Sequence, residues 1–315
     1  MGSTLTHLVD VGALDLPLPG DGATAERFDG LSEVGAVDLS LARLVEGHVD
    51  ALAILAEAGR SPADGAWGVW AADPPAHRVT ARRASGGWTL EGTKRYCSGS
   101  TALAHALVTA IDEDEQVRLF HVELDGAGIE PVKGTWPAVG MAGSDSLDTV
   151  FHAVFVPDPY VVGGPHWYRR RAGFWHGSVG VAACWFGGAL GAARLLAGLA
   201  ASSSDEHRLA HLGAAVARCA GMRAALHQAA AAIDADPLDV DGRGRSRALT
   251  VRHLVETGGA DVLERVGRGS GSAPMVFDEA HARRVADLPV YLRQTHAERD
   301  LAELGRTVVE SGRWP

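Results

Sequence analysis

The chain has 315 residues, of which 46% are hydrophobic and 22% are charged, and its formal net charge is −10. A chain of this length can bury a sizeable core in one large domain or in two smaller ones. The acidic balance argues against a nucleic-acid partner, because such a surface needs a clustered excess of Lys and Arg.

Three cysteines, Cys97, Cys184 and Cys219, lie far apart, and no Cys or His cluster has the spacing of metal ligands. We therefore predict no metal site. An odd cysteine count without a signal peptide indicates a reducing, cytoplasmic location. Residues 178–193 form an uncharged run, but sixteen Gly- and Ala-rich residues are too few for a membrane span. We predict a buried helix there and no membrane partner.

The first thirty residues contain several Pro and Gly and are predicted to be irregular. Asp38 is the expected N-cap of a helix over residues 39–58, which ends at Gly59. Apolar residues recur there every three or four positions, so one face of the helix is buried. His48 lies beside that face, either as a core histidine or as a residue facing a cofactor pocket.

Residues 66–163 change to period-two patterning, with turn signals between short apolar runs. Short, evenly spaced strands favour a small barrel or sandwich. No G-x-G-x-x-G motif follows a strand, so no Rossmann dinucleotide site is predicted. The predicted strands are 67–71, 77–83, 88–91, 94–98, 107–111, 118–123 and 149–156.

From residue 172 onward the pattern is helical, and four or five helices predict a bundle. The first of these helices contains Gly187, Gly188 and Gly191, each costing about 1 kcal/mol relative to Ala in an exposed helix. Such a cost indicates that another backbone or a flat ligand approaches closely. The predicted helices are 174–200, 207–233, 246–268, 278–298 and 299–310.

The stretch from Trp88 to Ser100, WTLEGTKRYCSGS, alternates like a strand, turns at Glu91-Gly92 and ends in hydroxyl-rich residues. On its own it fits an ordinary hairpin with a buried aromatic. Its spacing of Trp, Leu, Gly, Lys, an aromatic and a hydroxyl residue resembles the central strands of the acyl-CoA dehydrogenase superfamily. That resemblance implies that Tyr96 packs on a flavin ring and that Ser98 hydrogen-bonds the flavin near N5.

Further segments, between about residues 35 and 310, resemble the same superfamily in the same order: 136–146, 150–157, 173–175 and 291–300. The resemblance implies an α+β fold with a short N-terminal helical region (1–64), a small middle β-barrel domain (65–165) and a C-terminal helical bundle (166–315). It also implies FAD as cofactor. Members usually assemble through the bundle, so we expect a homodimer or homotetramer.

Two motifs depart from the superfamily pattern. The strand usually written Y-C-x-T-E-P has Ala72 in place of Thr and Asp73 in place of Glu, so Ala72 cannot donate the side-chain hydrogen bond that Thr gives the flavin. Residues 202–207 replace the segment whose Arg contacts the FAD pyrophosphate, and Arg208 is near enough to substitute. The predicted cofactor-binding residues are Trp70, Ala72, Tyr96, Cys97, Ser98 and Arg208.

Desaturation of an acyl thioester also needs a carboxylate base, whose pKa burial would raise toward neutrality. The superfamily's two base positions align with Gly177 and Thr295, and neither is acidic. If the backbone is helical, Glu298 shares a face with Thr295 and could act as the base. His296 is the alternative base. Residues 298–300 could equally form a solvated, salt-bridged surface.

Three functions follow from the resemblance. The first is an FAD-dependent oxidoreductase of acyl-CoA dehydrogenase type, which oxidises an acyl thioester such as an acyl-CoA or a related activated acyl group. The second is a flavin-dependent monooxygenase of the same fold, in which His296 or Ser98 handles the activated oxygen. The third is a non-catalytic, acyl-CoA dehydrogenase-like partner protein that has lost flavin. The first ranks highest on sequence alone.

Overall fold

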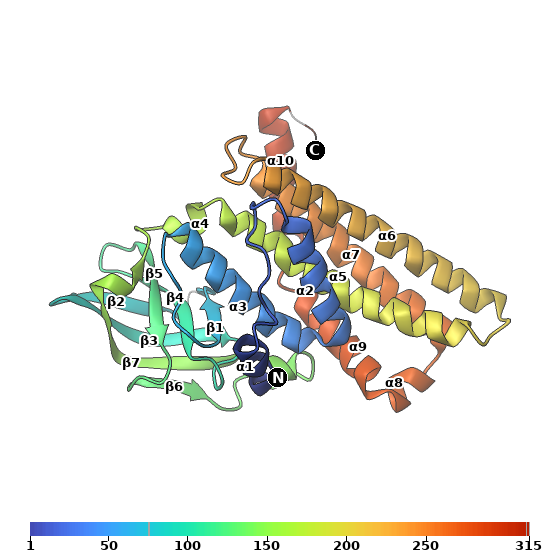
Figure 1. Ribbon diagram of the computed structural model, residues 1–315, viewed down its shortest axis with the longest axis horizontal. Coiled ribbons are helices and arrows are strands. Elements are labelled where there is room, and N and C mark those ends of the chain that lie inside the picture. The colour runs from blue at the N-terminus through green and yellow to red at the C-terminus, as the bar shows by residue number, and fades with distance from the viewer. Residues whose placement is uncertain (75, 313, 315) are drawn as a thin grey trace. The chain divides into compact units, whose positions relative to one another are not determined.

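The computed structural model describes residues 1–74, 76–312 and 314, and the chain forms two compact units, whose elements are labelled in Figure 1. The sheet unit comprises Met1–Asp15, Arg43–Ala138 and Ala142–Phe174. The helical unit comprises Leu16–Ala42, Val139–Met141 and Trp175–Pro315. The predicted domain boundaries at residues 64 and 165 stay a prediction.

Within the described residues the sheet unit forms one eight-stranded sheet in the order β6-β7-β3-β2-β4-β5-β8, with β1 paired to β4. Strand β1 runs parallel to β4, whereas β3 is antiparallel to both β2 and β7. A mixed sheet followed by a helical C-terminal region confirms the predicted α+β class. The strands are β1 (Trp67–Trp70), β2 (Val79–Ala84), β3 (Gly87–Cys97), β4 (His105–Ile111), β5 (Val117–Glu123), β6 (Ile129–Val132), β7 (Leu147–Pro157) and β8 (Val161–Val162).

Strand β3 is longer than the sequence predicts. The expected turn at Glu91-Gly92 is wrong, because β3 runs unbroken from Gly87 to Cys97. Gly92 has φ +123°, and the register between β3 and β7 shifts beside it. Glycine adopts this conformation without a steric cost, so the strand bends through a bulge and continues. This continuity carries β3 to the polar residues that follow Cys97.

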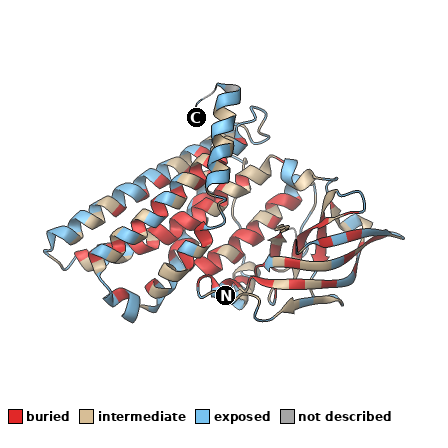
Figure 2. Ribbon diagram, turned by 180° about the vertical axis from the view of Figure 1, so that it is seen from behind, coloured by how far each residue is buried: buried red, intermediate tan, exposed pale blue. Residues whose placement is uncertain are grey.

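Helix α3 (Leu39–Glu57) confirms the helix predicted over 39–58, and Asp38 caps it as expected, accepting a hydrogen bond from the Leu41 N–H at 2.8 Å. Its buried residues are red in Figure 2. In the sheet unit, buried residues of α3 and of the strands form a hydrophobic cluster. Each fully buried large side chain in it stabilises the fold by about 1.5–3 kcal/mol. The cluster contains Ala51, Ile54, Leu55, Trp67, Leu107, Leu119 and Val162.

The first thirty residues are not irregular, which corrects the prediction. Helix α1 (Gly2–Asp10) begins the sheet unit, and α2 (Thr24–Val37) begins in the helical unit. No side chain next to it in sequence caps α2; instead, the Asp234 carboxylate accepts a hydrogen bond from the Thr24 N–H at 3.2 Å. A carboxylate at a helix N-terminus satisfies unpaired donors and complements the helix dipole. Because this cap is 210 residues away, local sequence could not predict it.

The helical unit is built around α5 (Gly173–Ala200), whose residues are mostly buried. Among the described residues it is the one helix long and apolar enough to cross a membrane, but 78% of its most apolar window is buried in the protein. The predicted core helix is confirmed. The other helices after residue 165 are α4 (Trp167–Arg170), α6 (Glu206–Ala235), α7 (Gly244–Ser270), α8 (Ala273–Phe277), α9 (Glu279–Leu292) and α10 (Glu298–Ser311).

The glycines of α5 let helix α2 approach its backbone. A Cβ on Gly191 would lie 2.6 Å from the Ala36 carbonyl oxygen, and one on Gly187 would lie 2.8 Å from Gly35 Cα. The Ser32 hydroxyl donates to the Ala183 carbonyl at 3.1 Å across the same contact. Of the two reasons that the sequence offered for these glycines, close backbone approach is the one that the structure shows.

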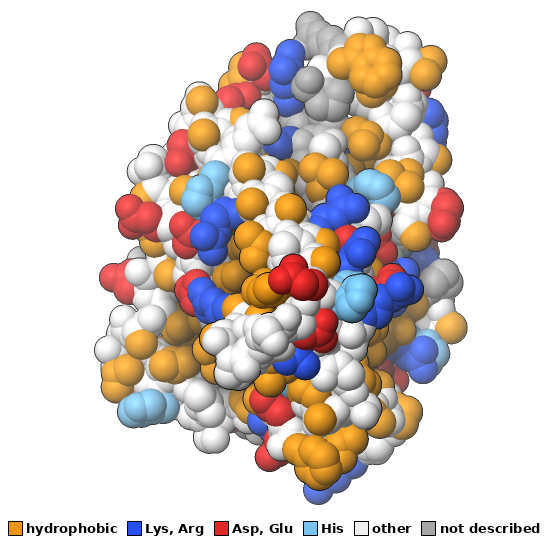
Figure 3. Space-filling model, turned by 90° about the vertical axis from the view of Figure 1, so that its right-hand side faces the viewer, with side chains coloured by type: hydrophobic (Ala, Val, Ile, Leu, Met, Phe, Trp, Pro, Cys, Tyr) orange, Lys and Arg blue, Asp and Glu red, His pale blue; other side chains and the backbone are white. Residues whose placement is uncertain are grey.

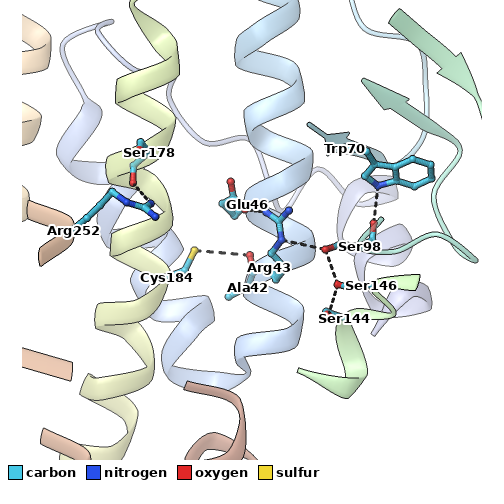
Figure 4. A network of polar contacts seen from close by, with 10 residues as sticks. All are labelled: Ala42, Arg43, Glu46, Trp70, Ser98, Ser144, Ser146, Ser178, Cys184 and Arg252. Atoms are coloured by element: carbon cyan, nitrogen blue, oxygen red, sulfur yellow. Dashed lines mark hydrogen bonds and ion pairs between the residues drawn. The ribbon is translucent and has the colours of Figure 1, made fainter. Parts of the chain in front are cut away.

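Arg252 joins three segments of the helical unit, and Figure 4 shows its contact with Ser178. It is 8% exposed, and its guanidinium donates to the carbonyl oxygens of Ser178 at 3.1 Å and Gln294 at 3.0 Å. The same group lies 4.5 Å from the centre of the Trp185 ring, a cation–π distance. Arg252 therefore ties α7 to α5 and to the turn that follows α9.

Charged side chains of both signs are interspersed with hydrophobic ones on the face shown in Figure 3. Ion pairs lie along α7, among them the exposed pair Arg268–Glu264 and the partly buried pair Arg265–Asp261. The short helix α8 exposes Met275, Val276 and Phe277. The described residues on this face therefore show no continuous basic surface of the kind that nucleic acids need.

Candidate functional site

The end of strand β3 leads into a network of hydroxyl groups in the sheet unit (Figure 4). Ser98 is 7% exposed, and its hydroxyl accepts a hydrogen bond from Arg43 Nε at 3.2 Å. Its oxygen also lies 2.8 Å from Ser146 Oγ, which lies 2.8 Å from Ser144 Oγ. The indole N–H of Trp70 donates to the Ser98 carbonyl at 3.1 Å. Both the backbone and the side chain of Ser98 are therefore fixed.

Local backbone geometry brings these serines together. The pairing of β3 with β7 ends at Cys97 and Leu147. Ser98 immediately follows Cys97 and Ser146 immediately precedes Leu147, so the two serines lie at the same end of the paired strands. Gly99 has φ +73°, and its N–H donates to the Ser144 carbonyl at 2.8 Å. A glycine is favoured here because the left-handed conformation costs other residues energy. The turn therefore places Ser98 against the 3-10 helix η1 (Ala142–Ser144).

Arg43 reaches this network from helix α3. Its guanidinium forms an ion pair with Glu46, one helical turn later on the same face. Both side chains are largely shielded from water, with 16% of Arg43 and 7% of Glu46 exposed. The Glu46 carboxylate compensates the charge of the Arg43 guanidinium in this shielded position, so the ion pair holds Arg43 beside Ser98.

Tyr96 has φ +61° and is 50% exposed. A bulky residue in the left-handed region is uncommon and costs of order 1–3 kcal/mol. The position coincides with the second register shift between β3 and β7, between Lys94 and Cys97. The Tyr96 ring meets Trp136 edge-on, with ring centres 6.3 Å apart. The buried Trp136 Nε1 has no hydrogen-bond acceptor among the described residues.

Asp73, which the sequence resemblance aligns with the superfamily's Glu, forms an ion pair with Lys94. Lys94 is fully buried and donates to both the carbonyl and the hydroxyl oxygen of Thr109, each at 2.7 Å. The Thr109 hydroxyl in turn lies 3.0 Å from the Asp73 carboxylate. Burial lowers the pKa of Lys94, and Asp73 opposes that shift. This pair ties the segment after β1, including the half-buried Ala72, to β3 and β4.

Two further candidates are core residues of the sheet unit. His48 is 4% exposed, its Nδ1 accepts a hydrogen bond from the Trp67 N–H at 3.2 Å, and burial lowers its pKa to about 4. It is the core histidine that the sequence offered as one alternative. Cys97 is buried, its thiol donates to the Lys94 carbonyl, and burial raises its pKa to about 12. A thiol in this state is a poor nucleophile.

Arg208 lies at the start of α6 in the helical unit. Its Nε donates to the Gly269 carbonyl at 3.0 Å and its Nη1 to the Leu199 carbonyl at 3.4 Å. Both acceptors are near the C-terminal ends of helices, where basic side chains satisfy free carbonyls. The role of Arg208 as a pyrophosphate ligand stays a prediction.

The proposed acid–base residues lie at the junction of α9 and α10. Helix α9 ends at Leu292 and α10 begins at Glu298, so the continuous helix predicted over 278–298 is wrong. The Thr295 hydroxyl donates to the Leu292 carbonyl at 3.0 Å, and Ala297 has φ +44°, which breaks the helical path. Glu298 is exposed. The shared helical face that would link it to Thr295 is therefore absent.

His296 has 60% of its side chain exposed, and its Nδ1 lies 3.4 Å from the Asp300 carboxylate. An exposed imidazole beside a partly buried carboxylate is an ordinary surface pair. The catalytic roles of His296 and Glu298 stay predictions. Among the described residues, no three His, Cys, Asp or Glu side chains come together as metal ligands would.

The groups around the end of β3 suit a planar heteroaromatic ligand with hydrogen-bond acceptors. They include an exposed aromatic ring on Tyr96, a hydroxyl on Ser98 and the buried N–H of Trp136, which has no acceptor among the described residues. A cavity of about 10 Å³ lies between Ser98 and residues of α3 and β1, including Gly47 and Val69. It holds about one water molecule, so a larger ligand would have to meet Ser98 from outside this cavity.

Sequence reasoning missed Arg43, Ser146 and Trp136 as candidates. The sequence places Arg43 beside the buried face of α3. That position is a weak signal, because Lys and Arg commonly bury their aliphatic part beside such a face and keep the charge in water. Ser146 and Trp136 lie in an irregular stretch between β6 and β7. Their proximity to Ser98 and Tyr96 follows from the sheet register, which the sequence does not reveal.

No protein-family profile matches the chain. A stretch of 86 residues is 33% identical to dibenzothiophene monooxygenase from Rhodococcus erythropolis, and the match covers 26% of this chain and 20% of that protein. TdsC from Paenibacillus sp. A11-2, solved with FMN and indole, superimposes with a TM-score of 0.84 at 19% identity, covering 98% of this chain and 90% of TdsC.

The methanesulfinate monooxygenase MsuC from Pseudomonas fluorescens superimposes with a TM-score of 0.82 at 19% identity, covering 98% of this chain and 90% of MsuC. At this level of identity the likeness establishes the fold. TdsC is itself described as a dibenzothiophene monooxygenase. The chain thus has the fold of these two monooxygenases, an α+β fold with a sheet and a helical C-terminal region.

Proposed function

We propose that this protein is a flavin-dependent monooxygenase of the acyl-CoA dehydrogenase fold. It would use O₂ and reduced FMN from a separate reductase to transfer one oxygen atom to a small organic molecule, while the other oxygen leaves as water. The observation that carries the proposal is the superposition on FMN-bound TdsC, which covers 98% of the chain. The local similarity to dibenzothiophene monooxygenase supports it independently.

Acyl thioester oxidation, the function ranked first on sequence alone, becomes the second candidate. That reaction needs a carboxylate to remove the α-proton. Gly177 and Thr295 occupy the superfamily's base positions, and the helical path that would recruit Glu298 is interrupted. A monooxygenase does not need this base, because its oxidising power comes from O₂ and the reduced cofactor.

FMN is the better candidate than FAD for two reasons. TdsC was solved with FMN. In addition, Arg208, the residue expected to replace the superfamily's pyrophosphate contact, donates to two backbone carbonyls of its own unit. FMN has a single phosphate and no pyrophosphate, so its binding would not require this arginine.

In this proposal the residues at the end of β3 bind and orient the flavin. The Tyr96 ring would lie against the flavin ring, the Ser98 hydroxyl would bond to an edge atom, and the Trp136 N–H would donate to a carbonyl oxygen. When bound, the flavin supplies the electrons that activate O₂. The chain itself supplies position, hydrogen-bond donors and protection from bulk water.

We infer a cytoplasmic protein of the acyl-CoA dehydrogenase superfamily that acts on small molecules and assembles as a homodimer or homotetramer. Light scattering that showed a monomer at micromolar concentration would refute the assembly. The non-catalytic alternative predicts a protein that binds no flavin.

The decisive assay supplies FMN, a flavin reductase, NADH and ¹⁸O₂, with indole as the probe substrate because TdsC was solved with it. We expect product that carries one ¹⁸O atom, formed only when the reductase is present. Ser98→Ala should lower this rate, and Ser100→Ala, a nearby buried serine, should leave it unchanged. Bleaching of bound flavin by an anaerobic acyl-CoA without a reductase would instead establish a dehydrogenase.

A further inference from the structure

The Ser98 hydroxyl has one proton and two lone pairs. Arg43 Nε donates to its oxygen at 3.2 Å. Because a guanidinium keeps its protons throughout the physiological pH range, one lone pair of Ser98 is permanently occupied. The hydroxyl therefore has one proton and one lone pair left for its other partners.

Ser146 is the second partner, at 2.8 Å, and either oxygen of this pair could be the donor. The same holds for Ser146 and Ser144 at 2.8 Å. Two arrangements are thus available. In one, Ser144 donates to Ser146 and Ser146 to Ser98, so the Ser98 proton points to a ligand. In the other, every bond is reversed and Ser98 presents its lone pair to the ligand.

The two arrangements match the two oxidation states of a flavin. Its N5 accepts a hydrogen bond when the flavin is oxidised and carries an N–H donor when it is reduced. We propose that the Ser98–Ser146–Ser144 chain reverses its hydrogen bonds with the oxidation state of the flavin, and that Arg43 is the positioning residue that holds Ser98 in both. This inference rests on the proposed function.

Reversing these hydrogen bonds requires only rotation of three hydroxyl groups, so the three serines neither gain nor lose a proton. The fixed donor must itself be rigid, and Arg43 meets that condition through its ion pair with the buried Glu46. The Trp70 bond to the Ser98 carbonyl at 3.1 Å keeps the backbone still while the hydroxyl turns. Figure 4 shows these groups converging on Ser98.

Ser146→Ala separates the two states. With oxidised FMN, Ser98 still accepts from Arg43 and donates to the flavin, so the dissociation constant should stay within about twofold. With reduced FMN, Ser98 accepts from the flavin and its own proton loses its acceptor. Loss of one such bond should raise the dissociation constant of reduced FMN about 3–10-fold. The two-electron potential of the bound flavin should fall correspondingly by about 15–30 mV.

Two further variants complete the test. Arg43→Lys keeps the charge but loses the fixed Nε donor, so it should weaken both oxidation states by similar factors. Ser100→Ala is the matched control. Ser100 is as buried as Ser98, but its hydroxyl donates to the Asp145 carbonyl and takes no part in the hydrogen bonds between Ser98, Ser146 and Ser144. This substitution should change neither constant. Thermal denaturation without flavin verifies that each variant is folded.

Anaerobic titration of FMN and of reduced FMN measures all of these constants. A selective loss for reduced FMN in Ser146→Ala supports the inference. Equal losses in both states, or no loss, would overturn it while leaving the proposed function intact. A wild-type protein that binds neither form would refute the proposed function and this inference together.

Discussion

Replacing Lys94 by Met tests the buried ion pair that holds the segment after β1. Lys94 has no exposed side-chain area, and 9% of Asp73 is exposed. The substitution keeps the length of the side chain but leaves the Asp73 carboxylate without its cation. Its nearest remaining cation is Arg169, whose Nη2 lies 3.7 Å away and whose side chain is 58% exposed.

An unpaired buried charge of this kind costs about 3–5 kcal/mol. At about 2–4 °C per kcal/mol for a domain of this size, the melting temperature of the sheet unit should fall by roughly 6–20 °C. The double variant Lys94→Met, Asp73→Leu removes both charges and should recover most of that loss. Thermal denaturation followed by circular dichroism measures all three proteins.

Arg268→Met is the matched surface control, because it removes the cation of an exposed ion pair. The Arg268 side chain is 65% exposed and that of its partner Glu264 is 59% exposed. Such pairs contribute about 0–1 kcal/mol, so its melting temperature should change little. If Lys94→Met were as mild as Arg268→Met, the Lys94–Asp73 pair would not hold this segment, and the reasoning would be refuted.

Three more predictions use other parts of the chain. Burial lowers the pKa of His48 to about 4, so the unfolded chain binds a proton that the folded chain does not accept, and the free energy of unfolding should fall as the pH falls from about 6.5 toward 4. His48→Gln should make this fall shallower in a pH series of denaturant melts, and the remaining fall reflects His121, whose pKa burial also lowers to about 4. Gly187→Ala should cost about 1–3 kcal/mol, since its Cβ would press on α2, whereas Gly198→Ala on the same helix meets nothing within 4 Å and should gain up to about 1 kcal/mol; equal effects in urea denaturation would contradict the packing. Trp136→Phe should weaken FMN binding about 3–10-fold with an unchanged melting temperature, because it removes the unused N–H and keeps the ring.

Local patterns predicted the helices that carry both a cap residue and a regular spacing of apolar residues within their own segment. Helix α3 follows its Asp38 cap, and α6 follows Asp205, whose side chain accepts a hydrogen bond from the His207 N–H at 2.9 Å. Helix α2 was beyond such reasoning because its cap is Asp234. The break between α9 and α10 depends on Ala297, which has a positive φ. A positive φ is usually predicted from a glycine, and the sequence has an alanine there.

The candidate site was predictable only along β3. The spacing of Tyr96 and Ser98 on one strand is a property of sequence, and the structure shows an exposed ring at Tyr96 and a fixed hydroxyl at Ser98. Arg43 and Ser146 reach Ser98 from 55 and 48 residues away. Contacts at that separation depend on strand register and helix placement, and both are settled by the packing of the whole core.

A crystal structure of the protein grown with FMN tests the central claim most directly. The account predicts one FMN per chain, with its ring system against Tyr96 and an edge atom within hydrogen-bond distance of Ser98 Oγ. Density for FMN elsewhere on the chain, or an FMN ring that leaves Tyr96 and Ser98 without contact, would contradict it.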